Sequence, residues 1–113
     1  MKYLLMVAVD ESADVDQEEI TVHVREVGDW AKKMSDRGVR VLGDRLRPAT
    51  DATTLRVRDG ELLISDGPFA ETKEQMAGFD VLECADLDEA IEVASQHPGA
   101  RMGVVELRPF WPV

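Results

Sequence analysis

Two histidines are the side chains of this chain best suited to acid–base chemistry near neutral pH. His23 follows Ile20 by three positions and precedes Val27 by four, so its imidazole borders the apolar stripe of an expected helix. An imidazole at such a border can act as a general acid or base, which makes His23 the catalytic candidate. The alternative is a partly buried structural histidine. His97 stands before Pro98, where we expect an imidazolium that bonds the last carbonyl groups of a second helix.

Acidic side chains at the predicted strands supply the candidate ligand-binding residues Asp44, Asp66 and Glu106. A carboxylate in or beside a strand must be solvated, paired or turned toward a pocket, and the same holds for Asp80. Any of the three candidates can orient the imidazole in a general acid–base pair. Glu106 also has a simple alternative, because alternation along the last strand places it on the same face as Arg108; the two can pair with each other or with Arg40.

The loop over residues 66–75 is the most distinctive segment. Gly67 before Pro68 favours extended backbone and the proline ring fixes its own φ, so we expect a rigid turn. Phe69, a further ligand-binding candidate, then requires an apolar socket, and its simplest role is to plug the edge of the core. Asp66 can bind a ligand or cap a short helix that begins near Ala70, and the general preference of Asp for such turns favours capping.

Charge and motifs exclude several classes of protein. The formal charge of −10 repels phosphate backbones and anionic lipids, so neither nucleic acid nor a membrane is an expected partner. No His-x-His, Cys-x-x-Cys or glycine-rich phosphate motif occurs, and we therefore predict no bound metal and no cofactor. The apolar residues 3–9 are too short to span a bilayer, which favours a cytoplasmic protein. The lone Cys84 is expected to be buried in a strand.

Hydrophobic periodicity predicts one α+β domain over residues 1–113. The expected elements are a strand over 3–9, a helix from Asp16 to about Gly38, a strand over 39–42, a hairpin of 54–58 and 61–65 around Asp59-Gly60, a strand over 78–84, a helix from Asp86 that stops at 97–99, and a strand over about 101–108. This order is βαβ, hairpin, βαβ. It predicts an antiparallel sheet with two helices on one face.

The first and last strands carry apolar residues on both faces, although two helices can cover only one face of a four-stranded sheet. A second copy placed sheet to sheet about a two-fold axis would cover the other face, so we predict a homodimer resembling a closed or nearly closed α+β barrel. The alternative is a monomer whose hairpin folds across the open face. The apolar tail over residues 109–113 is expected to pack in a groove of the same dimer.

Several strings of the chain resemble the YCII-related, DGPF-type domain family. They are Val57-Arg58-Asp59-Gly60, Ser65-Asp66-Gly67-Pro68-Phe69-Ala70-Glu71-Thr72-Lys73-Glu74-Gln75, Asp86-Leu87-Asp88-Glu89-Ala90 and Val105-Glu106-Leu107-Arg108-Pro109. The resemblance implies a ferredoxin-like α+β fold that is usually dimeric. It also implies small bacterial proteins, some fused to or encoded near extracytoplasmic-function sigma factors. The wider superfamily includes relatives for which a pocket centred on a His and an Asp is proposed as catalytic; His23 lies about one turn before the corresponding His, and no Asp here matches.

Two hypotheses of function follow from these observations. The first is a cytoplasmic homodimer that binds a small molecule or a protein partner in a cleft between the first helix, the sheet and the Asp66 loop. The resemblance implies an accessory or regulatory role, with a protein related to a sigma factor as partner. The alternative is a small cofactor-independent enzyme in which His23 and one acidic residue act as general acid and base.

Overall fold

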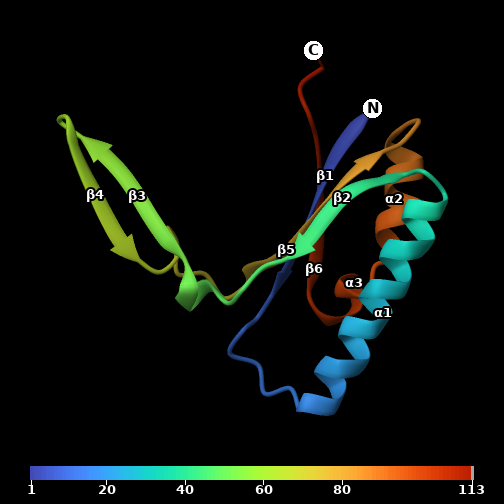
Figure 1. Cartoon of the computed structure of the whole chain (residues 1–113), viewed down its shortest axis with the longest axis horizontal. Helices are drawn as coiled ribbons and strands as arrows, with labels where there is room; N and C mark the ends of the chain where they lie inside the picture. The colour runs from blue at the N-terminus through green and yellow to red at the C-terminus, as the bar shows by residue number, and fades with distance from the viewer. Residues whose placement is uncertain (113) are drawn as a thin grey trace.

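Four antiparallel strands form the central sheet, in the order β2-β5-β1-β6 (Figure 1). The computed structural model describes residues 1–112. Its elements are β1 (Lys2–Val9), α1 (Gln17–Asp36), β2 (Arg40–Arg45), the 3₁₀ turn η1 (Ala49–Asp51), β3 (Thr53–Arg58), β4 (Glu61–Asp66), β5 (Gln75–Glu83), α2 (Leu87–Ser95), α3 (Gly99–Met102) and β6 (Val104–Pro109). The predicted α+β class and antiparallel pairing are confirmed.

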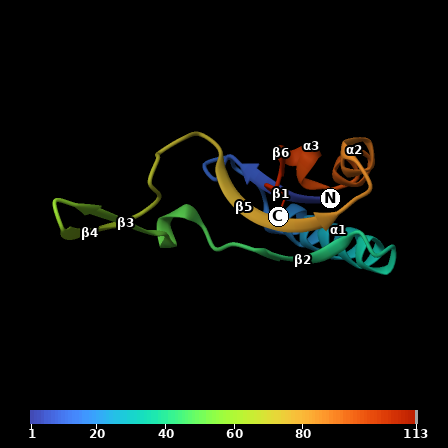
Figure 2. The same cartoon turned by 90° about the horizontal axis from the view of Figure 1, so that it is seen from above.

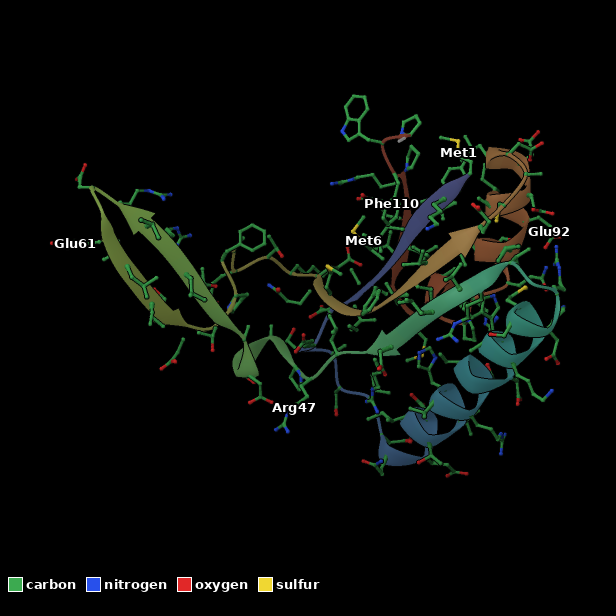
Figure 3. The ribbon with its side chains drawn as sticks, turned by 45° about the horizontal axis from the view of Figure 1, so that its top comes forward. Met1, Met6, Arg47, Glu61, Glu92 and Phe110 are labelled. Atoms are coloured by element: carbon green, nitrogen blue, oxygen red, sulfur yellow. The ribbon has the colours of Figure 1, made fainter. Side chains whose placement is uncertain are left out.

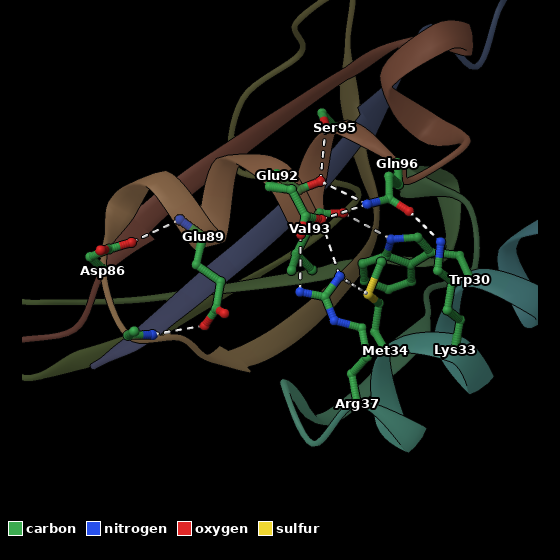
Figure 4. Close-up of polar contacts among 11 residues, drawn as sticks. Trp30, Lys33, Met34, Arg37, Asp86, Glu89, Glu92, Val93, Ser95 and Gln96 are labelled. Atoms are coloured by element: carbon green, nitrogen blue, oxygen red, sulfur yellow. Dashed lines mark hydrogen bonds and ion pairs between the residues drawn. The ribbon is translucent and has the colours of Figure 1, made fainter.

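Both long helices begin at the aspartates that the sequence indicates. Asp16 accepts a hydrogen bond from the backbone N–H of Glu19 at 2.8 Å, and Asp86 accepts one from Glu89 at 2.9 Å (Figure 4). Each cap satisfies a backbone donor that the helix itself leaves free, which stabilises the helix by about 1 kcal/mol. At the far end of α1 the chain turns at Gly38, with φ of 79° as expected for a left-handed cap.

The core lies between one face of the sheet and the two long helices. Alternate residues of β1, Tyr3, Leu5 and Val7, are buried, and they pack with Trp30 and Met34 of α1 and with Ala90, Val93 and Ala94 of α2. The Trp30 indole donates to the Val93 carbonyl oxygen at 3.0 Å and ties α1 to α2 (Figure 4). Burial of each large side chain stabilises the fold by roughly 1.5–3 kcal/mol. Cys84 is also buried in this core, as predicted.

The hairpin of β3 and β4, called the arm below, forms a two-stranded sheet of its own. Asp59 and Gly60 both have positive φ, 52° and 77°, which is the backbone of the predicted two-residue turn. The arm extends on the side of the sheet away from the helices (Figures 1 and 2). The alternative in which the arm folds across the open face of its own chain is therefore wrong. None of the helices over residues 1–112 is long and apolar enough to cross a membrane.

Two segments differ from the predicted elements. The last strand begins at Val104 and not near residue 101, because residues 99–102 form the short helix α3. No helix begins near Ala70. The Gln75 side-chain amide instead donates to the carbonyl oxygens of Ala70 and Thr72 at 3.0 and 3.1 Å, and these bonds hold the loop in a non-helical conformation.

Candidate functional site

A groove of about 570 Å³ lies between the first half of α1 and α3. Its lining side chains are Asp16, Glu18, Glu19, Val22, His23, Glu26, Arg101 and Met102. Helical spacing explains the α1 side, since Glu19, His23 and Glu26 recur at intervals of four and three along one face. We call this the α1–α3 groove. Its lining combines apolar surface with carboxylates and a single imidazole.

The His23 imidazole is the titratable group of this groove that suits proton transfer. Partial burial lowers the pKa of His23 below its usual 6.5; Glu26 raises it, whereas Arg101 and Arg45 lower it. The ring is therefore mostly neutral at pH 7 and can accept a proton. Arg101 is itself bonded to Glu26 at 2.7 Å. None of the ion pairs among residues 1–112 includes His23, so a ligand in the groove meets its ring without a competing carboxylate bond.

A second polar cluster lies beneath the helices, on the buried face of the sheet. Asp80 of β5 is 6% exposed and accepts a hydrogen bond from Arg40 Nε of β2 at 2.7 Å. His97, 3% exposed, follows α2 and places its Nε2 atom 4.0 Å from Asp80 Oδ2. Its other ring nitrogen, Nδ1, accepts the backbone N–H of Gly99 at 2.8 Å. The Trp30 ring meets the imidazole edge to face, with 4.6 Å between centroids.

Burial sets the protonation of this Arg40–Asp80–His97 cluster. The pKa of His97 is lowered to about 4, chiefly by desolvation and to a smaller extent by the nearby His23 and Arg40 side chains. Since Nδ1 accepts a bond from Gly99, the single ring proton sits on Nε2, which faces Asp80. Desolvation also raises the pKa of Asp80, while the Arg40 bond opposes that rise. The predicted imidazolium at the end of α2 is wrong, because His97 is buried and neutral at pH 7.

Gly43 is the residue that makes room for the Asp80 carboxylate. The two residues pair directly between β2 and β5. A Cβ atom at position 43 would collide with the Asp80 carboxylate and lie 2.6 Å from the Phe79 carbonyl oxygen. Only glycine permits this close approach, so the sequence of β2 fixes the space in which Asp80 reaches Arg40.

The other predicted site residues lie away from His23. Asp44 is paired with Phe79 and Glu106 with Met6, which places both acids on the sheet face without helices, one on each edge strand. Glu106 bonds Arg108 at 2.6 Å, so its predicted alternative partner is confirmed. Asp66 ends β4 and lies with Phe69 at the base of the arm. A single copy of the chain therefore does not gather these four residues around His23.

The loop after β4 differs from its predicted role. Asp66 caps no helix, because the chain after it is not helical. Phe69 is 80% exposed and plugs no part of the core of its own chain. The chain bends at Gly67, whose φ of 99° differs from the extended backbone expected before a proline, and the Phe69 ring is left exposed.

The sheet face without helices has an apolar centre, with Asp44, Glu106 and Arg108 on its edge strands. Strand register places Leu4 and Met6 of β1 beside Val81 and Phe79 of β5, with Leu42 and Val104 on the flanking strands. Met6 points away from α1 and α2 (Figure 3). Leu42 and Val104 are 51% and 43% exposed, and the other four are half-buried. We call these six side chains the open face. Nothing within residues 1–112 covers it.

Comparison with known proteins assigns the chain to a family. The YCII-related domain matches residues 1–113, the whole length of the chain. The chain belongs to the YCII-related domain family. It is also similar to an uncharacterized protein of Rhizobium meliloti (strain 1021), with 50% identity over 68 residues, 58% of this chain and 55% of that protein. The match thus spans about half the length of that relative.

Sequence reasoning missed the buried cluster of this YCII-related chain. Arg40, Asp80 and His97 come from three elements, and no motif or spacing joins them. One signal was available: Asp80 lies two positions before Leu82, and alternation along a strand places both on the same face. Because Leu82 is fully buried, the Asp80 carboxylate on the same face must be buried too. A buried carboxylate requires a cationic partner.

Proposed function

We propose that this YCII-related domain is a cytoplasmic homodimer that binds a small molecule in the α1–α3 groove and has an accessory or regulatory role. The observation that carries the proposal is the groove itself, in which the neutral His23 ring lies among paired and unpaired charges and apolar side chains. Small-molecule sites combine these features: apolar walls that contribute affinity and a few polar groups that fix orientation.

The dimer is supported by the open face. Two copies joined through it would remove six apolar side chains per chain from water, and each large one contributes roughly 1.5–3 kcal/mol when fully buried. The proposed topology is ferredoxin-like, with the arm inserted between two βαβ halves and the paired sheets forming an α+β barrel. The strand order β2-β5-β1-β6 and the shared helix layer support it. The DGPF-type strings favour the same arrangement by resemblance.

Charge favours a ligand that carries a basic nitrogen. The groove has four carboxylates, Asp16, Glu18, Glu19 and Glu26, against the single cation of Arg101. A ligand ammonium group would be attracted to the acidic end, while the His23 nitrogen would bond a hydroxyl or amide group of the same molecule.

A thermal-shift screen of amines against matched carboxylic acids tests this function. A ligand at about 100 times its Kd stabilises the native state by about 2.7 kcal/mol. In a domain of this size each kcal/mol of stabilisation raises the Tm by roughly 4–8 °C. We expect the response to amines, its loss in His23→Gln, and its retention in Arg25→Gln, an exposed α1 substitution outside the groove lining. A library that produces no shift, or a shift that His23→Gln leaves intact, would contradict the proposal.

A second candidate function is acid–base catalysis without a cofactor. It is favoured by the neutral His23 ring in the groove, which none of the ion pairs among residues 1–112 includes. Here His23 would take a proton from a ligand bound in the groove, and a groove carboxylate such as Glu26 would stabilise the resulting imidazolium. Proton NMR of each ligand from the screen, incubated with protein in heavy water, should reveal exchange or conversion that His23→Gln abolishes. Unchanged ligand spectra leave binding as the function.

A protein related to a sigma factor is the proposed macromolecular partner, by family resemblance. The C-terminal tail is a surface for such contact, because Phe110 and Trp111 are 42% and 92% exposed; Val113 lies outside the described residues. Copurification with a tagged chain, compared with a version truncated after Pro109, tests this partner. Equal recovery of partner proteins by both forms would contradict a role of the tail.

A further inference from the structure

The arm has one apolar and one polar face. Leu55 pairs with Ile64, and Val57 with Leu62, so these four side chains share a face because residues directly opposite in a pair of strands point the same way. Each of the four is 56–63% exposed. The opposite face carries mainly polar residues: Thr54, Arg56, Arg58, Glu61 and Ser65, with Leu63 among them.

Such a hairpin does not persist in water by its own pairing. An isolated two-stranded sheet is marginally stable at best, and it becomes stable when an apolar face packs against another element. The arm is nevertheless paired along its whole length, from Thr53 with Asp66 to Arg58 with Glu61. It extends away from the helices (Figures 1 and 2), and its apolar face is exposed in the single chain. The missing cover must come from another molecule.

We infer that the arm is a clasp whose apolar face packs on a second copy of the chain. This inference rests on the proposed homodimer and adds an interface element to it. The arm leaves the sheet on the side of the open face (Figure 2). A second copy docked on that face therefore lies next to the arm, and a two-fold axis gives each copy one arm and one surface to receive it.

The arm is needed to reach the area of a stable dimer. Six open-face side chains and the four arm side chains make ten per chain. Full burial of one exposed side chain of this kind removes roughly 60–120 Å² of apolar surface from water, and about two fifths of that surface is still accessible in the single chain, so the ten together offer about 240–480 Å². A standard interface buries about 800 Å² on each partner, of which about 450 Å² is apolar. The open face alone offers about 110–220 Å² and falls well short of that apolar area, whereas the two surfaces together reach it at the upper end of their range.

Paired substitutions on the two faces of the arm test the clasp. Leu55→Asp with Ile64→Lys replaces an opposed apolar pair by an opposed ion pair, and Arg56→Asp with Leu63→Lys makes the same change on the polar face. Both keep a favourable cross-strand pair. By sedimentation equilibrium we expect the first variant to raise the dimer Kd on the order of 100-fold or more, because two arms each lose two buried anchors. The second variant should leave Kd within a few-fold of the wild type.

Labelling of single cysteines gives a readout that survives any loss of arm stability. In a Cys84→Ser background, Val57→Cys places a thiol on the apolar face and Arg56→Cys places one on the polar face. Both positions are exposed in a single chain. Above the dimer Kd we expect maleimide to label Val57→Cys at least tenfold more slowly than Arg56→Cys, and the difference should disappear on dilution below Kd.

The outcomes separate the clasp from the dimer. If Met6→Asp on the open face dissociates the dimer while Leu55→Asp/Ile64→Lys leaves Kd unchanged, the clasp is overturned and the dimer stands. Equal labelling rates at positions 56 and 57 in an intact dimer also overturn it. A wild-type chain that stays monomeric at 100 µM overturns both. The clasp is supported if the dimer is weakened by Leu55→Asp/Ile64→Lys and not by Arg56→Asp/Leu63→Lys, and if the thiol of Val57→Cys is protected from maleimide in the dimer.

Discussion

Acidification should destabilise this protein through His97. The folded-state pKa of His97 is about 4, against 6.5 for a free imidazole. A folded pKa below the unfolded value means that the unfolded chain binds the extra proton first. The stabilisation is therefore complete above pH 6.5 and is lost as the pH falls from 6.5 toward 4. The geometry supports a lowered pKa for His97, because the second proton would have to bind Nδ1, which already accepts the Gly99 N–H.

The size of this loss follows from the two pKa values. A shift from 6.5 to about 4 corresponds to about 3 kcal/mol between pH 7 and pH 4, and to about 2 kcal/mol by pH 5. The ionisable groups that influence the ring are Asp80 of β5, Arg40 of β2 and His23 of α1. Asp80 acts in the opposite direction, because its raised pKa favours the fold at low pH.

A difference measurement isolates His97 from these neighbours. In His97→Asn, the side-chain oxygen can still accept the Gly99 N–H, but the residue no longer titrates. Urea unfolding followed by circular dichroism, at fixed protein concentration and pH 7, 6 and 5, gives the free energy of unfolding of both proteins. The wild type should lose about 2 kcal/mol more than His97→Asn between pH 7 and pH 5. Parallel pH profiles would show that the burial argument for His97 is mistaken.

Three further changes test the cluster and the helix caps by urea unfolding. Arg40→Gln should lower the free energy of unfolding by about 3–5 kcal/mol, because it leaves the buried Asp80 carboxylate unpaired. Adding Asp80→Asn should restore part of this stability. No restoration would argue against an unpaired charge as the cause. Gly43→Ala should lower the free energy of unfolding by roughly 1–3 kcal/mol, because the new methyl group overpacks against Asp80 and Phe79. Gly28→Ala, with open space around its Cβ position, should raise the free energy of unfolding by about 0.5–1 kcal/mol. Equal effects of the two changes would refute the close approach at Gly43. Asp86→Ala should cost about 1 kcal/mol as the α2 cap is lost, and an unchanged unfolding midpoint would refute that role.

Elements set by local chemistry could be predicted from the sequence. Asp16 and Asp86 identify both helix starts because a side-chain cap depends on residues three positions away. Asp59-Gly60 identifies the arm turn because the dipeptide fixes its own backbone. Apolar residues on both faces of β1, with two helices that can cover only one face, indicated an uncovered apolar face, and strand register shows which residues lie on it.

The candidate site was less accessible to sequence reasoning because its contacts are long-range. Asp80 meets Arg40 across 40 positions of the chain, and His97 reaches the cluster from the short connection between α2 and α3. The loop at Phe69 bends at Gly67 with a positive φ, and local sequence preferences do not determine which way such a loop points. His23 was placed correctly at the edge of a helix stripe, since helical periodicity alone decides that position.

The mass of the wild-type protein in solution tests the central proposal most directly. Sedimentation equilibrium at low micromolar concentration and physiological salt should give about 25 kDa, twice the 12.6 kDa of one chain. Met6→Asp, which places a carboxylate in the middle of the open face, should shift the mass toward that of a single chain. A wild-type mass of 12.6 kDa throughout the micromolar range would contradict the proposal that a second copy covers the open face.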